Sequence, residues 1–384
     1  MFIKLSFPKH DSRNLLLGIV LAFAMLDHTR MFFFYWQVNP TLIGQATWPV
    51  FLTRFLSHFF APTIFVLLGI ALYSYRQNYG AAKLCKTLCA TGILLLLVEL
   101  VVNNFLYTFD PYYRTIGLFI LGLLGLSFIC MAGLQYLGTN MLLVISLTLL
   151  FGHHLWDGIQ LQGNSFRSIS WYIFHQQKFL PVDNRLFIVN YTLIPWLPVL
   201  MLGYVIGKLF QRQADPAKRK CILVFAGYCS LALFFVLRLL NVYGDPVKWQ
   251  YDPQLLNTIM SFLNLTKYPA SLDYLTLTLG GIFLFLGYTS RIKVSNLWLL
   301  PLLSKNPLVV YLFSTFLIHF FAMMLLWIQG KDPMAMVITS MSYSESSPLV
   351  DYGYSIGPVY LIWIGIVLCC CFISQFVWGT SSSQ

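Results

Sequence analysis

Long apolar segments separated by short polar ones recur from one end of the chain to the other. Each has about the 20 residues that an α-helix needs to cross the hydrocarbon core of a bilayer. No long linker, internal repeat or low-complexity tract interrupts the series. The pattern therefore predicts an all-α transmembrane bundle, one domain over residues 1–384, with about ten spans near residues 14–34, 48–75, 84–106, 114–136, 140–158, 190–210, 221–242, 272–290, 307–328 and 355–377.

Composition excludes a water-soluble protein. Hydrophobic residues make up 58% of the chain, charged residues only 10%, and the mean hydropathy is +0.72. Soluble globular chains carry about 25% charged residues, and disordered chains are poorer in apolar residues than this one. The lipid bilayer is therefore an expected partner.

The basic residues are distributed unevenly between the two sides of the predicted bundle. If the N-terminus is inside, the inner segments hold most of the lysines and arginines, but only Asp11 and Asp215 among the acidic residues. This asymmetry predicts that both termini are cytoplasmic. It also accounts for the net charge of +11 without a nucleic acid partner. The outer segments 159–189, 243–271 and 329–354 are long enough to build a site.

The first predicted span ends in three ionisable residues, Asp27, His28 and Arg30. Ionisable residues inside a bilayer are costly and usually functional. Because neighbours on a helix point about 100° apart, Asp27 can pair with Arg30 but cannot orient His28. An orienting partner for His28 must come from another helix. We interpret His28 as a candidate general base, the alternative being a buried structural histidine.

The second span places Arg54 and His58 on one helix face, with His58 at a depth similar to that of His28. Two histidines at one depth could line a common cavity. The alternative is that Arg54 lies at the headgroup level and His58 is a packing residue. Glu99 is a lone carboxylate of the third span, and Arg54 or Arg238 are its candidate partners.

The fifth span ends in His153, His154 and Asp157, and either histidine can reach the carboxylate. We expect Asp157 to hold a neutral imidazole in one tautomer rather than to share a metal ion, and we expect no metal. His319 is expected to be a core residue. The eight cysteines have no metal-like spacing and do not suggest a disulfide framework.

Several motifs, taken in order, resemble one family. They are Leu26 to Arg30, Thr53-Arg54 through His58 to Ala61-Pro62, Leu97 to Leu100, Gly152-His153 to Asp157, Ile194-Pro195-Trp196, Arg238 to Pro246 and Ser261 to Gly280. Over residues 12–327 the chain resembles the bacterial branch of the heparan-alpha-glucosaminide N-acetyltransferase family, distantly related to the acyltransferase-3 enzymes. It departs from that family at Asn14 and Leu17, where an Asp and an Arg are usual, and at Asn39, where eukaryotic members have a luminal catalytic histidine.

The resemblance implies a membrane acyltransferase that moves an acetyl group from cytoplasmic acetyl-CoA to an acceptor, typically a sugar, on the far side, with the residue at the His28 position catalytic. Attack on a thioester needs a base and donors for the oxyanion. We expect His28 to act as base, Asp157 or Glu99 to orient it, and Arg54 or Asn241 to lie near the oxyanion. The wider set of catalytic candidates includes Asp27 and His58.

Further residues are candidates for binding the two substrates. Basic and amide side chains near the inner mouth are candidates for the CoA phosphates and pantetheine arm: Arg291, Lys293, Lys305 and Asn306. The outer candidates for a sugar are Tyr243, Asp245, Asn264 and Lys267, with His153, His154 and Glu99. For Tyr243 to Pro246 the alternative is an ordinary turn.

The expected function is acetyl transfer to an envelope glycan or similar acceptor, in a bacterial cytoplasmic membrane and in a possible homodimer. Two alternatives stay open. One is a transporter or flippase for a small or lipid-linked molecule, which would use the same buried charges as a proton relay. The other is a catalytically degenerate homologue that binds acyl-CoA without turnover.

Overall fold

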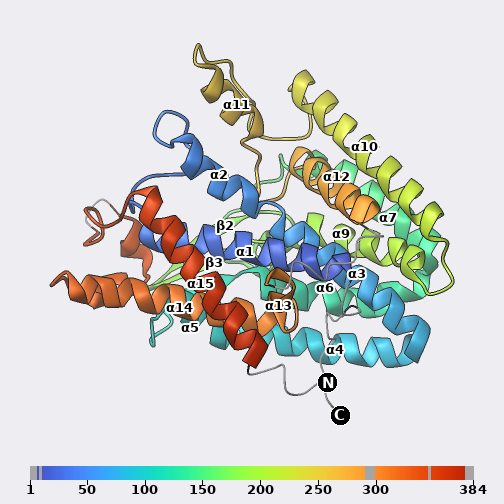
Figure 1. The fold of residues 1–384 in the computed structure, drawn as a ribbon, viewed down its shortest axis with the longest axis horizontal. Coiled ribbons are helices and arrows are strands. Elements are labelled where there is room, and N and C mark those ends of the chain that lie inside the picture. The colour runs from blue at the N-terminus through green and yellow to red at the C-terminus, as the bar shows by residue number, and fades with distance from the viewer. Residues whose placement is uncertain (1–6, 8–10, 290–298, 345–346, 377–384) are drawn as a thin grey trace.

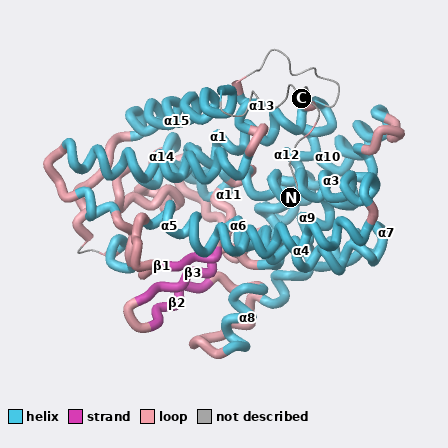
Figure 2. Tube along the Cα trace, turned by 90° about the horizontal axis from the view of Figure 1, so that it is seen from below, coloured by secondary structure: helices cyan, strands magenta, loops and turns pink. Residues whose placement is uncertain are grey.

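The computed structural model describes residue 7 and residues 11–289, 299–344 and 347–376. Within these residues, long helices pack side by side and a small sheet lies at one edge of the bundle (Figures 1 and 2). The helices are α1 (Ser12–Phe33), α2 (Trp48–Ser57), α3 (Phe60–Tyr79), α4 (Ala81–Leu97), α5 (Asn104–Thr108), α6 (Ile120–Leu134), α7 (Gly138–Gly152), α8 (Phe166–Phe174), α9 (Leu193–Ile206), α10 (Pro216–Leu240), α11 (Leu255–Leu263), α12 (Leu272–Thr289), α13 (Leu300–Leu303), α14 (Pro307–Ile328) and α15 (Ile356–Phe376).

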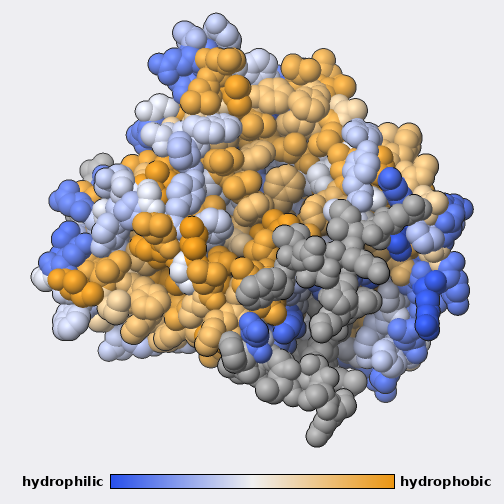
Figure 3. Space-filling model, in the orientation of Figure 1, coloured by the Kyte–Doolittle hydropathy of each residue, from blue (hydrophilic) through white to orange (hydrophobic). Residues whose placement is uncertain are grey.

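Within the described residues, nine helical stretches are long and apolar enough to cross a membrane. One of them, Ile120–Trp156, contains both α6 and α7, which two of the ten predicted spans cover. Hydrophobic side chains cover the middle of the face in Figure 3, and hydrophilic ones gather toward its edges. The chain is thus a helical membrane protein.

The predicted second span is broken into α2 and α3, and Pro62 explains the break. Proline has no N–H to donate to the carbonyl of the residue four positions earlier, and its ring clashes with that carbonyl. Here that carbonyl belongs to His58, and it accepts a hydrogen bond from the Tyr274 hydroxyl at 2.6 Å instead. A side chain of α12 therefore satisfies the backbone group that the proline leaves free, as a membrane interior requires.

Close packing of glycines fixes how α3 sits against α9. A Cβ on Gly69 would lie 2.4 Å from the backbone oxygen of Leu200, and one on Gly203 would lie 2.5 Å from that of Val66. Only glycine permits this approach of two backbones, as in other packed membrane helices. Gly92 of α4 and Gly125 of α6 make a similar contact.

The predicted all-α class misses a three-stranded sheet of β1 (Thr115–Leu118), β2 (Lys178–Val182) and β3 (Arg185–Val189). The strand order is β1-β3-β2, with β1 parallel to β3 and β2 antiparallel to β3. A short turn at Asp183, which has a positive φ of 51°, joins β2 to β3. The apolar run 115–118 falls within the predicted span 114–136 because the residues that follow it in the sequence are equally apolar. Pairing with a strand from far along the chain makes it a strand instead.

The helix α1 is buried along most of its length and contacts α2, α3, α13, α14 and α15. Near its start, Gly18 meets the backbone of Leu300, and Cys371 late in α15 bonds to Leu299. The start of α1 and the end of α15 therefore lie on the same side of the bundle. The terminal residues themselves lie outside the described ranges, and the cytoplasmic location of both termini stays a prediction.

Candidate functional site

A polar cavity of about 520 Å³ lies beside the second half of α1. Helices α1, α2, α3, α5, α6 and α14 form part of its wall, and loops and the edge strand β2 form the rest. Its lining residues are Ala24, Asp27, His28, Arg30, Met31, Asn39, Pro40, Thr41, Arg54, Ser57, Phe60, Tyr107, Phe119, Ile120, Gln177, Phe179, Asn190, Tyr191, Lys267, Tyr268 and Tyr311. Segments from almost the whole chain thus meet at one place.

Asp27 is the centre of an ion-pair network in this cavity. Arg30, one turn further along α1, donates from Nη2 to Oδ1 at 2.9 Å, as its spacing from Asp27 predicts. Arg54 of α2 donates from Nη1 to Oδ2 at 2.8 Å, and the Ser57 hydroxyl donates to the same oxygen at 2.9 Å. The carboxylate therefore ties α2 to α1. Arg54 pairs with Asp27 and not with Glu99, so the Glu99–Arg54 prediction is wrong.

His28 lines the same cavity. Its ring lies edge-on to Tyr107 and Tyr311, with centroids 6.1 Å and 5.8 Å away. Among the described residues, no side chain or backbone group forms a hydrogen bond with the His28 ring. The prediction of an orienting carboxylate is therefore wrong in this arrangement, and aromatic contacts from two other helices hold the ring instead.

Neither of the two predicted orienting carboxylates reaches His28. Glu99 accepts hydrogen bonds from the Asn103 amide at 2.6 Å and the Gly122 backbone N–H at 2.8 Å. It is fully buried, in a π-helical segment at Val98–Asn103. A π-helical turn widens the helix and often marks a special site. Here it lets Glu99 bond to the first turn of α6, so Glu99 joins this π-helical segment to α6, whose Ile120 lines the cavity.

Asp157 is instead paired with two histidines, away from the polar cavity. His154 holds one carboxylate oxygen at 2.6 Å through Nδ1, and His175 holds the other at 3.0 Å through Nε2. Burial alone would raise the pKa of Asp157, but these hydrogen bonds outweigh burial and hold it well below its usual range. The Nε2 of His154 accepts from the backbone N–H of Leu272, so the cluster fixes the start of α12. It is His154, not His153, that pairs with Asp157.

His153 bonds to the Leu150 carbonyl at 2.9 Å through Nδ1. Sequence reasoning missed His175, which follows α8 in the chain, well after His153 and His154, and gives no periodic signal. In the part of the chain that the structure describes, no group of three or more His, Cys, Asp or Glu side chains is arranged to hold a metal ion. His319 bonds at 3.2 Å and 3.0 Å to the Leu106 and Met336 carbonyls, which confirms it as a core residue.

Lys267 and Tyr268 enter the cavity from the loop before α12. Lys267 is only 7% exposed, and burial lowers the pKa of its ammonium group. The Tyr268 hydroxyl lies 3.3 Å from that of Tyr191. Burial alone would raise the pKa of Tyr268, but the charges of Lys267 and Arg54 outweigh burial and lower it. Of the predicted outer sugar-binding residues, Lys267 is the one that lines the cavity.

Asp245 holds this loop in place rather than facing a substrate. It accepts hydrogen bonds from the Thr266 N–H at 2.9 Å, the Thr266 hydroxyl at 2.7 Å and the Ser271 hydroxyl at 2.6 Å. Asn264 donates to the Thr41 carbonyl at 3.0 Å and so supports another wall segment. Tyr243 bonds to the carbonyl of Phe151. Asp245 and Asn264 thus support segments of the cavity wall, whereas Tyr243 bonds to a residue that does not line the cavity.

Two further catalytic candidates, Asn241 and His58, are not among the residues that line the cavity. Asn241 has a left-handed backbone with φ of 55° at the end of α10, and its amide bonds to Trp249, outside the cavity. It cannot serve an oxyanion there. His58 is 3% exposed, and its ring packs at 5.0 Å from that of Tyr274, behind the cavity wall. α2 ends at Ser57, so His58 is the residue that caps it, and it fits the alternative of a packing residue.

Arg238 is fully buried and pairs with backbone groups. It donates to the carbonyls of Val247, Phe262, Ser261 and Asn264 at 2.8–3.1 Å. Its Nη1 also lies 3.7 Å from Asp273. The predicted alternative of a Glu99–Arg238 pair is therefore also wrong, and Arg238 anchors the loop that carries α11.

A second, apolar cavity of about 260 Å³ adjoins the first. It is lined by Leu21, Phe60, Ile64, Leu68, Thr91, Leu95, Ile120, Leu121, Leu124, Phe128, Lys305, Asn306, Pro307, Leu308, Val309 and Tyr311. Lys305 is exposed and Asn306 is half-buried at the start of α14. Arg291 and Lys293, the other predicted CoA contacts, lie outside the described residues.

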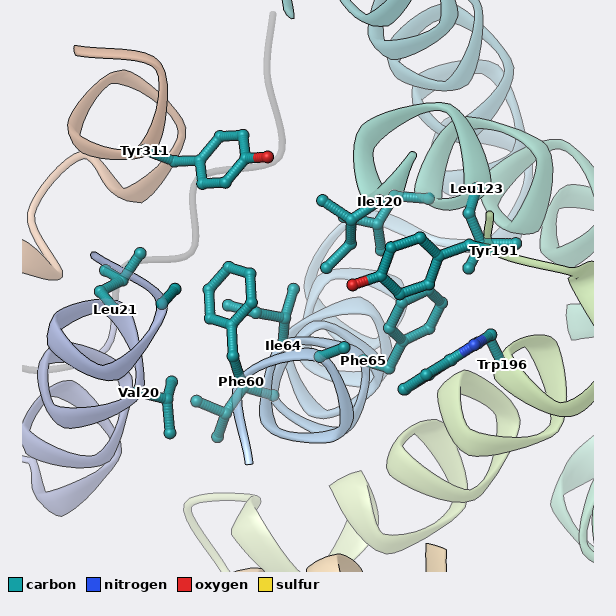
Figure 4. Close-up of a cluster of buried hydrophobic side chains, with 14 of the residues drawn as sticks. Val20, Leu21, Phe60, Ile64, Phe65, Ile120, Leu123, Tyr191, Trp196 and Tyr311 are labelled. Atoms are coloured by element: carbon teal, nitrogen blue, oxygen red, sulfur yellow. The ribbon is translucent and has the colours of Figure 1, made fainter. Parts of the chain in front are cut away.

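The two cavities share Phe60, Ile120 and Tyr311. Figure 4 shows these three side chains, together with Tyr191, pointing toward one space from four segments of the chain. Four helices contribute to both cavities in a consistent order. Along α1, Leu21 lines the apolar cavity and His28 the polar one.

The same order holds on the other three helices. On α3 the lining of the apolar cavity runs from the shared residue Phe60 forward to Leu68, and on α6 from Ile120 forward to Phe128. On α14 it runs from Tyr311 backward along the chain to Lys305. The step of eight positions from Phe60 to Leu68 corresponds to about 12 Å of helix. The cavities are therefore stacked along the helix axes, with the apolar one toward Lys305 and the polar one toward the sheet.

No protein-family model matches the chain, and no curated protein matches it. Function must therefore be inferred from the two cavities and the residues that line them.

Proposed function

We propose that this protein is a transmembrane acyltransferase. It takes an acetyl group from acetyl-CoA that enters the apolar cavity and delivers it to a sugar hydroxyl or amine in the polar cavity. The observation that carries the proposal is the stacking of the two cavities, which meet at Phe60, Ile120 and Tyr311. A reaction between substrates from opposite sides of a membrane needs such a meeting point, with a different chemical lining on each side.

The lining of the apolar cavity suits the donor. The acyl end and the arm of acetyl-CoA carry no charge, whereas its far end carries phosphates. Leu21, Ile64 and Leu124 surround the cavity, and Lys305 with Asn306 lies at its far end. Lysine is a common phosphate partner. The donor would therefore lie with its phosphates at the side where basic residues predict the cytoplasm, consistent with a bacterial cytoplasmic membrane.

The polar cavity supplies the chemistry. His28 removes the proton from the acceptor hydroxyl or amine, whose oxygen or nitrogen attacks the thioester carbonyl. The new bond to the acetyl carbon forms, the carbon–sulfur bond breaks, and the proton passes from His28 to the departing thiolate of CoA. Tyr311 lines both cavities and its hydroxyl points into the space between them (Figure 4), so it is placed to donate to the developing oxyanion.

Arg54 and Arg30 line the same cavity and are held by Asp27. Their charge favours any negative charge that develops in the cavity. Asp27 keeps both guanidinium groups in fixed positions, which is a positioning role and not a base role.

The test uses the purified full-length protein in detergent. Calorimetric titration with acetyl-CoA, CoA and ATP measures donor binding, and CoA release with a panel of sugars measures turnover. Saturable binding of acetyl-CoA but not of ATP is expected. His28→Ala should keep this binding and lose turnover by about 10²- to 10⁴-fold.

Lys305→Met should weaken acetyl-CoA binding, while Lys86→Met should not. Lys86 is an exposed lysine of α4 that lines neither cavity. If folded protein binds neither acetyl-CoA nor CoA, the proposal is refuted and a transporter becomes the better interpretation. If it binds acetyl-CoA but transfers to no acceptor, a catalytically degenerate protein is indicated.

A further inference from the structure

We infer that the acceptor carries an anionic group, a phosphate or a carboxylate, which Arg30, Arg54 and Lys267 hold inside the polar cavity. The inference rests on the proposed function in one respect, namely that the occupant of this cavity is the acceptor. The starting observation is a charge imbalance: three cationic side chains line the cavity and Asp27 is the one carboxylate among its lining residues.

The Asp27 carboxylate does not satisfy all the hydrogen-bond donors of these cations. Asp27 takes one nitrogen from Arg30 and one from Arg54. Arg30 is only 9% exposed, and its Nε is buried without a hydrogen-bond partner among the described residues. A buried donor left unpaired is destabilising, so a built site with such a donor is suited to a ligand that accepts from it.

Lys267 is the second sign of an anion site. It is 7% exposed and makes no ion pair with any described residue. Its Nζ lies 5.5 Å from the centroid of the Tyr268 ring, and the Tyr268 hydroxyl is its hydrogen-bond partner. A buried ammonium group without a carboxylate in ion-pair contact is costly. Asp245 nevertheless fixes the loop on both sides of Lys267 with three hydrogen bonds, from the Thr266 N–H and hydroxyl and from the Ser271 hydroxyl, which holds the ammonium group at the cavity.

The neutral part of the lining indicates the rest of the acceptor. Amide and hydroxyl groups of Asn39, Thr41, Gln177 and Asn190 lie around the same cavity. Such groups bond to sugar hydroxyls, and guanidinium groups bind phosphate or carboxylate oxygens in pairs. A cavity of about 520 Å³ is in the range of small-ligand sites. A sugar phosphate or a sugar acid, free or as part of a lipid or glycan, has this combination.

A competing explanation is that the three cations act only on the oxyanion of the transition state. In that case a neutral sugar and its phosphate would bind equally well in the absence of the donor. The donor's own phosphates are a second competitor, but Lys305 lies at the opposite end of the stacked cavities.

The experiment measures binding by calorimetry without any CoA, so that it does not depend on turnover. The probes are glucose 6-phosphate and glucuronate, with glucose as the neutral match. Glucose 6-phosphate should bind saturably and at least about tenfold more tightly than glucose, a difference of about 1.4 kcal/mol. Lys267→Met should remove most of this preference, and Lys267→Arg should restore part of it.

Lys331→Met is the matched control. Lys331 is an exposed lysine after α14 that lines neither cavity, and its loss should change nothing. The source of the anion is distinguished with nanodiscs. If phosphatidylglycerol competes with glucose 6-phosphate and phosphatidylcholine does not, the anion belongs to a lipid headgroup; if neither competes, it belongs to a soluble or glycan-bound sugar.

Three results would overturn the inference: no binding of either anionic probe, equal binding of glucose and its phosphate, or competition between glucose 6-phosphate and CoA for one site. Failure of the proposed function looks different. In that case glucose 6-phosphate binds in a Lys267-dependent way but acetyl-CoA does not bind, and the anion site stands without the acyltransferase.

Discussion

Replacing Asp27 with asparagine tests the network at the centre of the polar cavity. The change keeps the shape of the side chain and removes its charge. In the native protein the two carboxylate oxygens accept from Arg30 at 2.9 Å, Arg54 at 2.8 Å and Ser57 at 2.9 Å. Asparagine offers one oxygen and turns an amide N–H₂ toward one of these donors, so at least one bond is lost and two guanidinium groups lose their counter-charge.

The size of the effect follows from burial. Removing one partner of a buried ion pair costs about 3–5 kcal/mol. The side chains of Asp27, Arg30 and Arg54 are 11%, 10% and 19% exposed, so water can reach part of the network. We therefore expect the free energy of unfolding of Asp27→Asn to fall by about 3 kcal/mol, at the lower end of that range.

The assay is urea unfolding of the detergent-solubilised protein, followed by tryptophan fluorescence and extrapolated to zero urea. Asp351→Asn is the control, because Asp351 is exposed and makes no hydrogen bond or ion pair with a described residue; its change should stay within about 0.5 kcal/mol. The double variant Asp27→Asn/Arg54→Gln should recover part of the loss, since it also removes a stranded cation. A single variant as stable as the native protein, or two losses that simply add, would refute this reasoning.

Three other changes have defined outcomes. Gly69→Ala should lower the free energy of unfolding by about 1–3 kcal/mol in the same urea assay, because its Cβ would lie 2.4 Å from the Leu200 carbonyl oxygen. Asp245→Asn should weaken the binding of glucose 6-phosphate in calorimetry as well as lower stability, because its hydrogen bonds fix the loop that carries Lys267. Burial alone would raise the pKa of Asp157, but two histidine hydrogen bonds hold it below its usual range. Its ionised form therefore stabilises the protein fully above the unfolded-state pKa of about 3.9, and this contribution is lost as the pH falls through the lower folded-state pKa. The stability difference between the native protein and Asp157→Asn, measured by urea unfolding at several pH values, should shrink below about pH 4.

Contacts within one helix were predictable from the sequence. The span near 307–328 coincides with α14, and the spacing of Asp27 and Arg30 is enough to predict their pair. Both depend only on the period and hydrophobicity of a single helix.

Contacts between segments were not predictable in the same way. Arg54 meets Asp27 because α2 ends before Pro62 and crosses α1 at its own angle, which helical spacing does not determine. Lys267 reaches the cavity because Asp245 fixes its loop from the end of α10. The roles expected for Asn241 and Asp157 failed for the same reason, since each is held by a partner from a segment whose position only the folded chain determines.

The sheet that closes one side of the polar cavity has a consequence for biogenesis. Its first strand, at Thr115–Leu118, pairs along its length with Arg185–Val189, which the ribosome makes only after α6, α7 and α8. Until then the first strand presents unpaired backbone groups. The polar cavity wall around Phe179 and Asn190 cannot form before α7 has crossed the membrane and the chain has returned to the side of the sheet. The apolar cavity also includes residues from late in the chain. The sheet is therefore a late element of the fold, because it closes only after α7 and α8 have been made.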